Sequence, residues 1–512
     1  MSDQKRPGRG PQVVVVGAGP CGAALALGLA RAGWAVTLVE QLAPGLARPY
    51  RGEGLMPSGV EALEALALWP LPARVRHRPL AGWAVVLERQ PFFTVAEPLA
   101  EDRGCWLVDQ ASLLSQLRAE LEGGSGGRVL EGQAVRGLLR AAGVGRANAD
   151  GGRKRRMAVD GRRERPRAEP APGRVAGVVL ADGTELRADL VVACDGRNSM
   201  LRRLAGLGLE EEGAGRLTGE GPPLDPKERG DPREGQELEG RPQGEGAGDR
   251  RGRDRQSARW AEREGEREPV WWFRLAGAAV APLERWLAGR FLTVVGAGVS
   301  FALFAEAGGE TLRLGWVAEA GVALPADGAG WREGWAAALP EEAAALVRDL
   351  PLAAIEGPQR FPVRVGWAPR WHVPGLLLLG DAAHPMRPVR AQGINMALRD
   401  ALLAARLLGP LGGRPPVEAA PGPRPPEALG ATHASIDALL PTVAARRLQE
   451  ILPLQAAQAR EAGLGARLRQ LGWLRRGLAA TAPWSGPLAR RRWIQRQHRL
   501  RQGLPGALSL PE

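Results

Sequence analysis

The sequence predicts an α/β fold built around a Rossmann-like parallel sheet, and three observations support this fold class. A β-α-β unit occupies residues 12–40, with a glycine-rich turn between its first strand and its helix. Two further apolar runs, 190–194 and 376–379, have the length and composition of buried strands. Each run leads directly into an aspartate motif. Because ligands of open α/β sheets bind beyond the carboxyl ends of the strands, these three turns are the candidate site.

The glycine-rich turn has the spacing of a dinucleotide-binding fingerprint. Gly17, Gly19 and Gly22 follow the valine run 13–16. The first glycine permits a tight turn, the second lets the backbone approach a pyrophosphate, and the third lets helix and strand pack closely. The helix N-terminus then offers unpaired N–H groups and a partial positive charge to the phosphates. Glu40 ends the second strand, where it can accept a hydrogen bond from an adenosine ribose.

The other two strand ends carry candidate ligand-binding carboxylates. Asp381 follows Gly380 after the run 376–379, and a helix with apolar spacing then begins near Gly393 and Asn395. A carboxylate at this strand end can bind ribityl hydroxyl groups, while the helix directs its N-terminus at an electron-rich ring. Asp195 ends the run 190–194, where it either contacts the nucleotide or caps an Asp-Gly turn.

These three motifs, in this order, resemble those of the group A flavoprotein monooxygenases, the aromatic hydroxylase family, and are most similar to its ubiquinone-biosynthesis hydroxylase-like branch. The resemblance implies non-covalently bound FAD, NAD(P)H as a transient co-substrate, and O₂. It also implies a flavin C4a-hydroperoxide that transfers oxygen to an electron-rich ring. Only one nucleotide fingerprint is visible, which fits a family in which NAD(P)H binds transiently and reduces a mobile flavin.

The resemblance adds two site residues and reveals one departure. Arg51 resembles the arginine that lies near the flavin phosphates in this family. Gln110 stands at the start of a helix expected over 109–121, where many members carry a flavin-binding arginine. Arg390 and Ala391 replace the small, glycine-rich run common in relatives, which leaves the flavin contact at this point open.

The expected architecture is a Rossmann-like FAD-binding domain with an interleaved α+β substrate domain, the aromatic hydroxylase fold, followed by C-terminal helices. Strands are expected over 80–98, and strands with a helix pair over 271–362. The expected segments are 11–79, 101–205 and 363–410 for the FAD-binding domain, 80–100 and 206–362 for the substrate domain, and 431–512 for the helical region.

Two segments interrupt this pattern. Residues 141–173 are rich in Arg, Gly and Pro, and residues 210–268 mix both charge signs with almost no aliphatic side chains. The longer insert cannot bury enough apolar area to offset its ordering entropy, so we expect it to be disordered. Acidic residues are at least as frequent in it as basic ones, and it holds one tryptophan. We therefore expect a solvated loop and no nucleic-acid binding.

Composition limits the other functional classes. The net charge of +13 suits anionic lipid, nucleic acid or acidic substrates, but the abundance of Ala, Gly and Pro favours a simpler explanation, a GC-rich genome that prefers arginine codons. The three cysteines form no CxxC pair and the five histidines are scattered, so neither a disulfide framework nor a metal site is expected. We expect no signal peptide and no membrane-spanning run, and hence a cytoplasmic protein that is peripheral to the membrane at most.

The C-terminal region has two interpretations. Leucines at helical spacing form a stripe beside several arginines; the leucines are Leu464, Leu468, Leu471, Leu474 and Leu478, and the arginines are Arg467, Arg469, Arg475 and Arg476. This pattern is typical of a helix that lies on an anionic membrane surface. It is equally typical of a surface helix whose stripe packs on the protein core.

The substrate and its chemistry stay open at this stage. A cavity built from Trp, Phe and aliphatic residues suits a small lipophilic ring, and no residue can be assigned as its general base. His384 is expected to pack beneath the flavin rather than act as an acid or base. Two other classes compete with a hydroxylase. One is a geranylgeranyl-reductase-like or halogenase-like flavoenzyme, and the other is a non-catalytic flavin-binding interaction protein.

Overall fold

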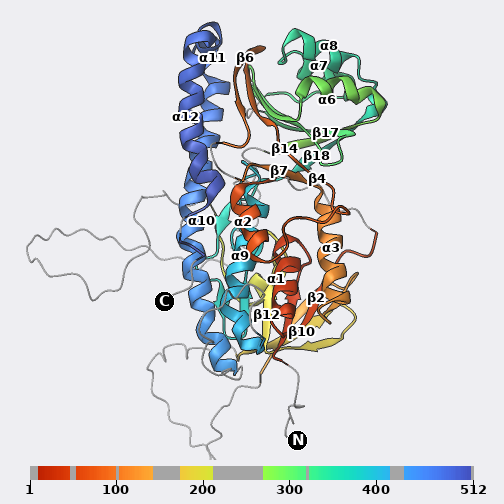
Figure 1. The fold of residues 1–512 in the computed structure, drawn as a ribbon, viewed down its shortest axis with the longest axis vertical. Coiled ribbons are helices and arrows are strands. Elements are labelled where there is room, and N and C mark those ends of the chain that lie inside the picture. Colours follow the sequence, from red (N-terminus) through yellow and green to blue (C-terminus); the bar gives the residue numbers. More distant parts are fainter. Residues whose placement is uncertain are drawn as a thin grey trace, which may run out of the picture.

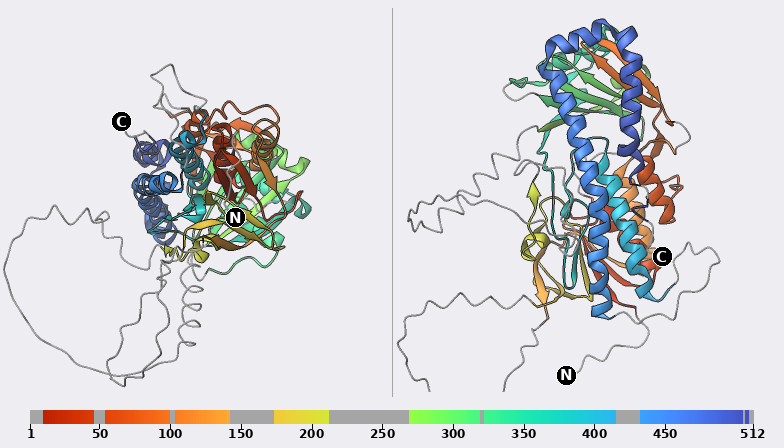
Figure 2. Two further views of the ribbon diagram at one scale, coloured as in Figure 1. Left: turned by 90° about the horizontal axis from the view of Figure 1, so that it is seen from below. Right: turned by 90° about the vertical axis from the view of Figure 1, so that its left-hand side faces the viewer.

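The computed structural model describes residues 10–45, 54–99, 103–141, 173–211, 269–318, 322–414, 432–504 and 506–508 (Figure 1). Arg51 lies outside the described residues, as do 142–172 and 212–268, which make up nearly all of the two predicted inserts. The described chain forms two sheet-centred units, with a long pair of helices running beside both (Figures 1 and 2). The predicted α/β fold class is confirmed.

The first unit contains a six-stranded sheet. Its strand order is β20-β21-β12-β1-β2-β8, and every pairing is parallel except that of β20 with β21. The strands are β1 (Gln12–Val16), β2 (Ala35–Val39), β8 (Arg128–Leu130), β12 (Leu190–Ala193), β20 (His372–Val373) and β21 (Leu376–Leu378). The three apolar runs identified in the sequence are therefore adjacent strands, and their carboxyl ends meet at one edge.

Helices pack against this sheet and bury its apolar residues. They are α1 (Pro20–Arg31), α2 (Pro57–Ala65), α3 (Gln110–Gly123) and α9 (Gln392–Leu408). α1 packs against both α3 and α9. A Cβ on Gly28 would lie 3.2 Å from Cβ of Ala405, so this glycine lets α1 and α9 approach closely. The helix predicted over 109–121 is α3, which Asp109 caps by accepting a hydrogen bond from N–H of Ala111 at 3.3 Å.

The second unit is a seven-stranded sheet with helices on one face. Its order is β18-β14-β17-β16-β15-β5-β6, and only β15 and β5 pair in parallel. The strands are β5 (Gly82–Leu87), β6 (Gln90–Ala96), β14 (Val270–Ala276), β15 (Arg290–Val295), β16 (Val299–Ala305), β17 (Thr311–Ala318) and β18 (Ile355–Phe361). The helices α6 (Ala281–Leu287), α7 (Gly328–Ala336) and α8 (Glu341–Arg348) lie on one side of it (Figure 1). β5 and β6 come from an early part of the chain, so the two units are interleaved.

Smaller elements complete the described fold. A three-stranded sheet contains β3 (Gly54–Leu55), β7 (Trp106–Val108) and β4 (His77–Pro79), and another contains β11 (Glu185–Arg187), β10 (Val175–Leu180) and β9 (Val135–Arg140). β13 (Glu210–Glu211) pairs with β19 (Gly366–Trp367). The short helix α4 (Met200–Leu204) follows β12, and a 3₁₀ turn, η4 (Gly380–Ala382), follows β21.

The C-terminal helices form a hairpin that spans both units. α10 (His433–Gln470) runs along the first unit to the second, α11 (Gly472–Ala480) turns the chain, and α12 (Ala482–Gln502) returns (Figure 2). α10 contacts α9, β15 and β16, while α12 contacts β6 and α2. A Cβ on Gly486 would lie 2.5 Å from the carbonyl oxygen of Phe92, so α12 lies directly against β6. Within the described residues, we find no helix both long and apolar enough to cross a membrane.

Candidate functional site

In the glycine turn between β1 and α1, two of the three glycines lie against neighbouring backbone and the third does not. Gly17 has φ +99°, and a Cβ there would lie 2.3 Å from the carbonyl oxygen of Cys194. A Cβ on Gly22 would lie 2.0 Å from the carbonyl oxygen of Gly17. A Cβ on Gly19, in contrast, would have no atom within 4 Å. The turn therefore needs two glycines for its own packing, whereas the third leaves space at the start of α1.

Glu40 braces this turn from the end of β2. Its side chain is buried, and Oε2 accepts a hydrogen bond from N–H of Ala18 at 2.9 Å. Oε1 accepts a second hydrogen bond from N–H of Leu42 at 3.0 Å. The carboxylate expected at a ribose thus also stabilises the backbone conformation of the glycine turn.

The Gly380-Asp381 turn lies next to the N-terminus of α1. Gly380 has φ +59°, and a Cβ there would lie 3.3 Å from Cβ of Cys21 in α1. A Cβ on Gly393, in the first turn of α9, would lie 4.0 Å from Oδ1 of Asp381. Nη2 of Arg197 lies 3.3 Å from Oδ2 of Asp381. The structure therefore brings Gly380, Asp381 and Gly393 together, close to the glycine turn.

Asp195 contributes one bonded and one unbonded oxygen to this edge. Oδ2 accepts hydrogen bonds from the N–H groups of Met200 at 2.8 Å and Leu201 at 3.1 Å, which caps α4. Oδ1 is buried and has no hydrogen-bond partner within the described residues. Leaving a buried acceptor unbonded costs about 1–3 kcal/mol, so a donor from a ligand is expected there. Nη1 of Arg202 donates to the carbonyl oxygen of Ala382 at 2.6 Å and so joins α4 to η4.

Two of the predicted residues have different surroundings. Asn395 is buried and fully engaged with backbone: Oδ1 accepts from N–H of Met56 at 2.8 Å, and Nδ2 donates to the carbonyl oxygens of Gly54 at 3.1 Å and Ala391 at 2.8 Å. It thereby fixes the start of β3 to the loop before α9. Gln110 is the partly exposed first residue of α3.

A buried network of charged side chains holds the Gly380 turn in place. Nε2 of His384 lies 2.6 Å from Oδ2 of Asp400, which also accepts a hydrogen bond from N–H of Gly380 at 2.7 Å. Nε of Arg447 donates to Oδ1 of Asp400 at 2.6 Å. Burial alone would raise the pKa of Asp400, but the charges of His384 and Arg447 outweigh it and lower that pKa. The His384 ring also stacks on Trp371, with ring centroids 5.1 Å apart, so it positions the turn.

The sheet of the second unit turns an aromatic face toward the first unit, opposite its helices. We call this the aromatic layer: Trp83, Phe93, Trp272, Phe291 and Phe304 from the sheet, and Trp493 from α12. Neighbouring rings have centroids 4.9–6.3 Å apart. Met56 and Ala391, from the first unit, pack on the same cluster. Apolar ring surface therefore lies directly beside the loop that precedes α9.

Sequence reasoning missed several residues at this edge. Arg197 bonds Asp381, Arg202 bonds the backbone of η4, and Trp493 comes from the C-terminal helix. For the contact between Arg197 and Asp381, the one available signal was that Arg197 directly follows the Asp195-Gly196 motif. Nothing in the sequence indicated the other two, because each joins segments far apart in the chain.

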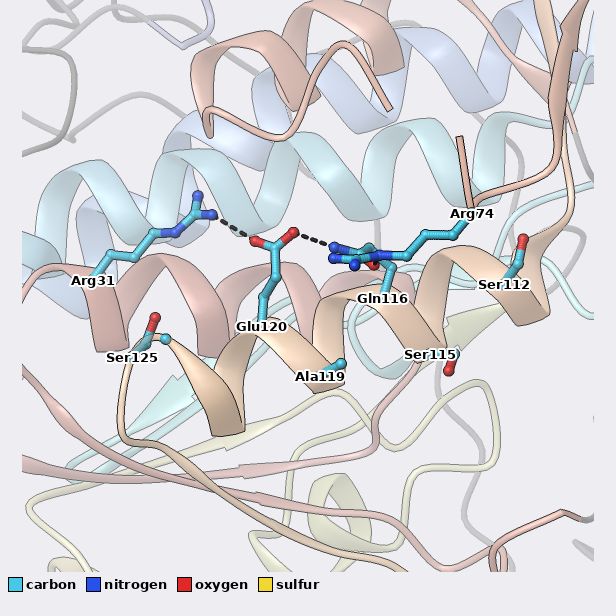
Figure 3. Close-up of a pocket in the computed structure, with 9 residues that line it drawn as sticks. Arg31, Arg74, Ser112, Ser115, Gln116, Ala119, Glu120 and Ser125 are labelled. Carbon is cyan, nitrogen blue, oxygen red and sulfur yellow. Dashed lines mark hydrogen bonds and ion pairs between the residues drawn. The ribbon is translucent and has the colours of Figure 1, made fainter. Parts of the chain in front are cut away.

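A hollow at the opposite end of α1 has no part in this arrangement. It measures about 710 Å³, and Arg31, Gln116 and Glu120 line it together with Arg74, Ser112, Ser115 and Ser125 (Figure 3). Arg31 pairs with Glu120 at 2.7 Å. Arg31 ends α1, whereas the glycine turn precedes its first residue, so this hollow lies away from the candidate site.

Comparisons with known proteins agree with this geometry. The family model described as "FAD binding domain" matches residues 11–220 and 323–414. The chain is 29% identical to 6-methylpretetramide 4-monooxygenase of Streptomyces rimosus over 422 residues, which cover 80% of this chain and 78% of that protein.

Solved structures show the same fold. PqsL of P. aeruginosa in complex with 2-aminobenzoylacetate superposes with a TM-score of 0.58 at 20% identity, covering 92% of this chain and 98% of PqsL. 2-methyl-3-hydroxypyridine-5-carboxylic acid oxygenase superposes with a TM-score of 0.57 at 15% identity, covering 90% of this chain and 93% of that enzyme. CtdE in complex with FAD and a substrate has a TM-score of 0.55 at 14% identity, and 88% of each chain is covered.

Proposed function

Because this chain belongs to the FAD-binding domain family and is a group A FAD-dependent monooxygenase, we propose that it hydroxylates a lipophilic aromatic or quinone-like compound with NAD(P)H and O₂. The observation that carries this proposal is the aromatic layer beside the loop before α9. A ring stacked there would lie next to the edge at which the three sequence motifs meet. Membership of the ubiquinone-biosynthesis-like branch stays a prediction.

The described residues fit FAD. The open space at Gly19 suits a pyrophosphate, and the N-terminus of α1 suits its charge. The unbonded Oδ1 of Asp195 suits a hydroxyl donor, and Asp381 beside Gly393 suits the ribityl chain. We propose that Gly17, Gly22 and Glu40 shape the pyrophosphate contact and that Gly380 shapes the ribityl contact. We also propose that Arg51, Gln110 and Asn395 lie around the cofactor. When bound, FAD would take a hydride from NAD(P)H and activate O₂ for oxygen transfer.

The ligands named for the structural neighbours support an aromatic substrate. 2-aminobenzoylacetate and a hydroxypyridine carboxylic acid are both compounds with an aromatic ring. These names favour ring hydroxylation over the geranylgeranyl-reductase-like and halogenase-like alternatives. They also favour an enzyme over a non-catalytic flavin-binding protein.

Flavin content, NADPH oxidation and O₂ uptake test the proposal directly. Purified protein should be yellow, should release free FAD on acid treatment, and should consume NADPH and O₂ faster when an aromatic substrate is present. Asp381→Asn should weaken FAD binding about 10-fold or more, because a charged acceptor is lost. Asp349→Asn, at an exposed carboxylate after α8, removes the same charge and should not. Unchanged FAD affinity in Asp381→Asn would show that this assignment is wrong.

We also propose that the C-terminal hairpin touches anionic membranes through its tip. Trp473 and Trp484 are 70% and 78% exposed, and Leu488 is 52% exposed. The exposed arginines around them are Arg467, Arg476, Arg491 and Arg492. Exposed tryptophans with basic neighbours are typical of a membrane-interface surface, and each arginine adds about 1 kcal/mol near anionic lipid.

The predicted leucine stripe contributes less than expected to this surface. α10 ends before Leu471, so the stripe crosses a helix break, and Leu468 and Leu478 pack on the second sheet. Arg469 and Arg475 are buried, and Nε of Arg475 lies 2.5 Å from Oε1 of Glu88. The part of the stripe that faces the sheet thus follows the core-packing interpretation, and the tip carries the membrane proposal.

Flotation with phosphatidylglycerol vesicles tests the hairpin tip. The wild-type protein should float with these vesicles at low salt and be released at high salt. The double variant Trp473→Ser/Trp484→Ser should float much less, whereas Leu352→Ser, at a leucine 47% exposed elsewhere on the surface, should behave as wild type. Equal flotation of the double variant and the control would contradict the proposal.

A further inference from the structure

Arg390 occupies an unusual position between the cofactor edge and the aromatic layer. It lies on the loop that joins the Gly380-Asp381 turn to α9, two residues before that helix begins. Its guanidinium carbon lies 4.8 Å from the ring centroid of Trp83 and 5.1 Å from that of Trp493. Trp83 comes from the second sheet and Trp493 from α12. The centroids of the two indoles are 5.7 Å apart, so both rings lie to one side of the cation, one ring from the second sheet and one from the C-terminal hairpin.

The backbone at this point is held in a conformation that side chains rarely adopt. Arg390 has φ +58° and Ala391 has φ +50°. Residues other than glycine in this left-handed region cost of order 1 kcal/mol each, and they persist where the surroundings fix them. Glycines here would avoid that cost, as in the glycine-rich run that Arg390 and Ala391 replace. A large cationic side chain is retained at a position where it is conformationally unfavourable, which points to a use for that side chain.

The hydrogen bonds of Arg390 leave one edge of the guanidinium unfilled. Nη2 lies 3.0 Å from Oε1 of Glu461 in α10, which neutralises part of the charge. Nε is buried and has no hydrogen-bond partner within the described residues. Only 11% of the Arg390 side chain is exposed. A buried N–H donor of a cation without an acceptor is costly, so an acceptor from a ligand is expected at this edge.

The two indoles also restrict how a ligand can approach. A guanidinium carries its N–H donors in its own plane, and its two faces are the parts that stack on aromatic rings. An acceptor oxygen for Nε must therefore lie in the plane of the guanidinium, at the edge that holds Nε, and not over the two indole rings. A planar ring attached to that oxygen would extend along the aromatic layer, beside Phe93 and Phe291.

We propose that Arg390 is a specificity-determining residue that binds a carboxylate or ionised enol oxygen on the aromatic substrate. The proposal rests on the proposed function and narrows it, from a lipophilic ring to a ring that carries one acidic substituent. Glu461 then holds the guanidinium in place when the site is empty. The acidic group sets the register of the ring on the aromatic layer, and thus which ring carbon faces the cofactor edge.

The test compares two probes of nearly the same size and shape that differ at one substituent, the anionic 3-hydroxy-2-naphthoate and its neutral amide, 3-hydroxy-2-naphthamide. Their dissociation constants are measured on the FAD-loaded protein by tryptophan fluorescence quenching and by the shift of the flavin absorbance. Wild-type protein should bind the carboxylate about 10-fold or more tightly than the amide, since a charged hydrogen bond is gained. Equal affinities for the two probes in wild-type protein would overturn the proposal without any variant.

Variants separate recognition from packing. Arg390→Gln should lose the preference for the carboxylate while its affinity for the amide changes little. Arg390→Lys should keep part of the preference, because lysine retains the charge but not the planar fork. Glu461→Gln should strengthen carboxylate binding, because it removes a negative charge that competes for the Arg390 guanidinium. Arg370→Gln, at an exposed arginine before β20, removes the same charge and should leave the preference intact.

Two results would identify a structural clamp instead. One is that Arg390→Gln and Glu461→Gln weaken both probes equally, and the other is that Arg390→Lys behaves like Arg390→Gln while the amide also binds poorly. FAD content and NADPH oxidation, measured on the same preparations, test the proposed function separately. A yellow, NADPH-oxidising protein without charge preference refutes only the role of Arg390.

Discussion

Two substitutions in the glycine turn separate its role in folding from its proposed role in cofactor binding. Gly22→Ala places a Cβ 2.0 Å from the carbonyl oxygen of Gly17, far inside van der Waals contact. The backbone of β1 or α1 must therefore shift, at a cost of about 1–3 kcal/mol. Gly19→Ala places its Cβ in open space at φ −73°, so the protein without cofactor should lose less than about 1 kcal/mol.

The two variants should consequently behave in opposite ways with FAD. Gly22→Ala should melt at least about 2 °C below wild type even without cofactor. Gly19→Ala should melt near the wild-type temperature but bind FAD about 10-fold or more weakly, because its Cβ stands where the pyrophosphate would approach. Thermal melts of the cofactor-free protein and titration with FAD measure the two effects.

Gly123→Ala provides the control for the substitution itself. Its Cβ would meet no atom within 4 Å at the end of α3, and alanine favours a helix, so stability should be unchanged or slightly higher. Wild-type FAD affinity in Gly19→Ala would refute a dinucleotide at this turn. A wild-type melting temperature in Gly22→Ala would refute the close contact itself.

Three further predictions concern buried charges. The pKa values of Asp400 and Glu450 are lowered in the folded protein: burial opposes this, but the nearby cationic side chains outweigh it. Their stabilisation should be complete at neutral pH and lost as the pH falls below their ordinary values of 3.8 and 4.5, which acid titration of the melting temperature measures. Arg447→Met should destabilise the protein by about 3–5 kcal/mol in urea unfolding, because Arg447 contacts both carboxylates; a loss below 1 kcal/mol would contradict this. Glu97→Ala removes the carboxylate whose Oε2 lies 2.6 Å from Nη2 of the buried Arg501 in α12. This change should weaken the packing of α12, which limited proteolysis would detect as faster cleavage of the hairpin at unchanged FAD content. Wild-type protease resistance would count against this prediction.

Much of the first unit could be predicted from local sequence. The runs at 13–16, 190–194 and 376–379 are continuous and apolar because a parallel sheet buries both faces of its central strands. Gly17 and Gly380 mark turns at positive φ that few other residues adopt. These signals are local, so they located the glycine turn, Asp195 and Asp381 at one edge of the sheet. The second unit was predicted as strands and helices, but not its strand order.

Only the tertiary structure shows which residues far apart in the chain contact one another. The sequence determined the turns, the strand runs and the family, because each depends on residues that are neighbours in the chain. It could not place Arg390 beside Trp83 and Trp493, or divide the leucine stripe between sheet and solvent. Those outcomes depend on side chains more than 90 residues apart, whose contact depends on how the two sheets and the hairpin pack. Apolar patterns identify which residues are buried, but packing geometry selects the partner that each one meets.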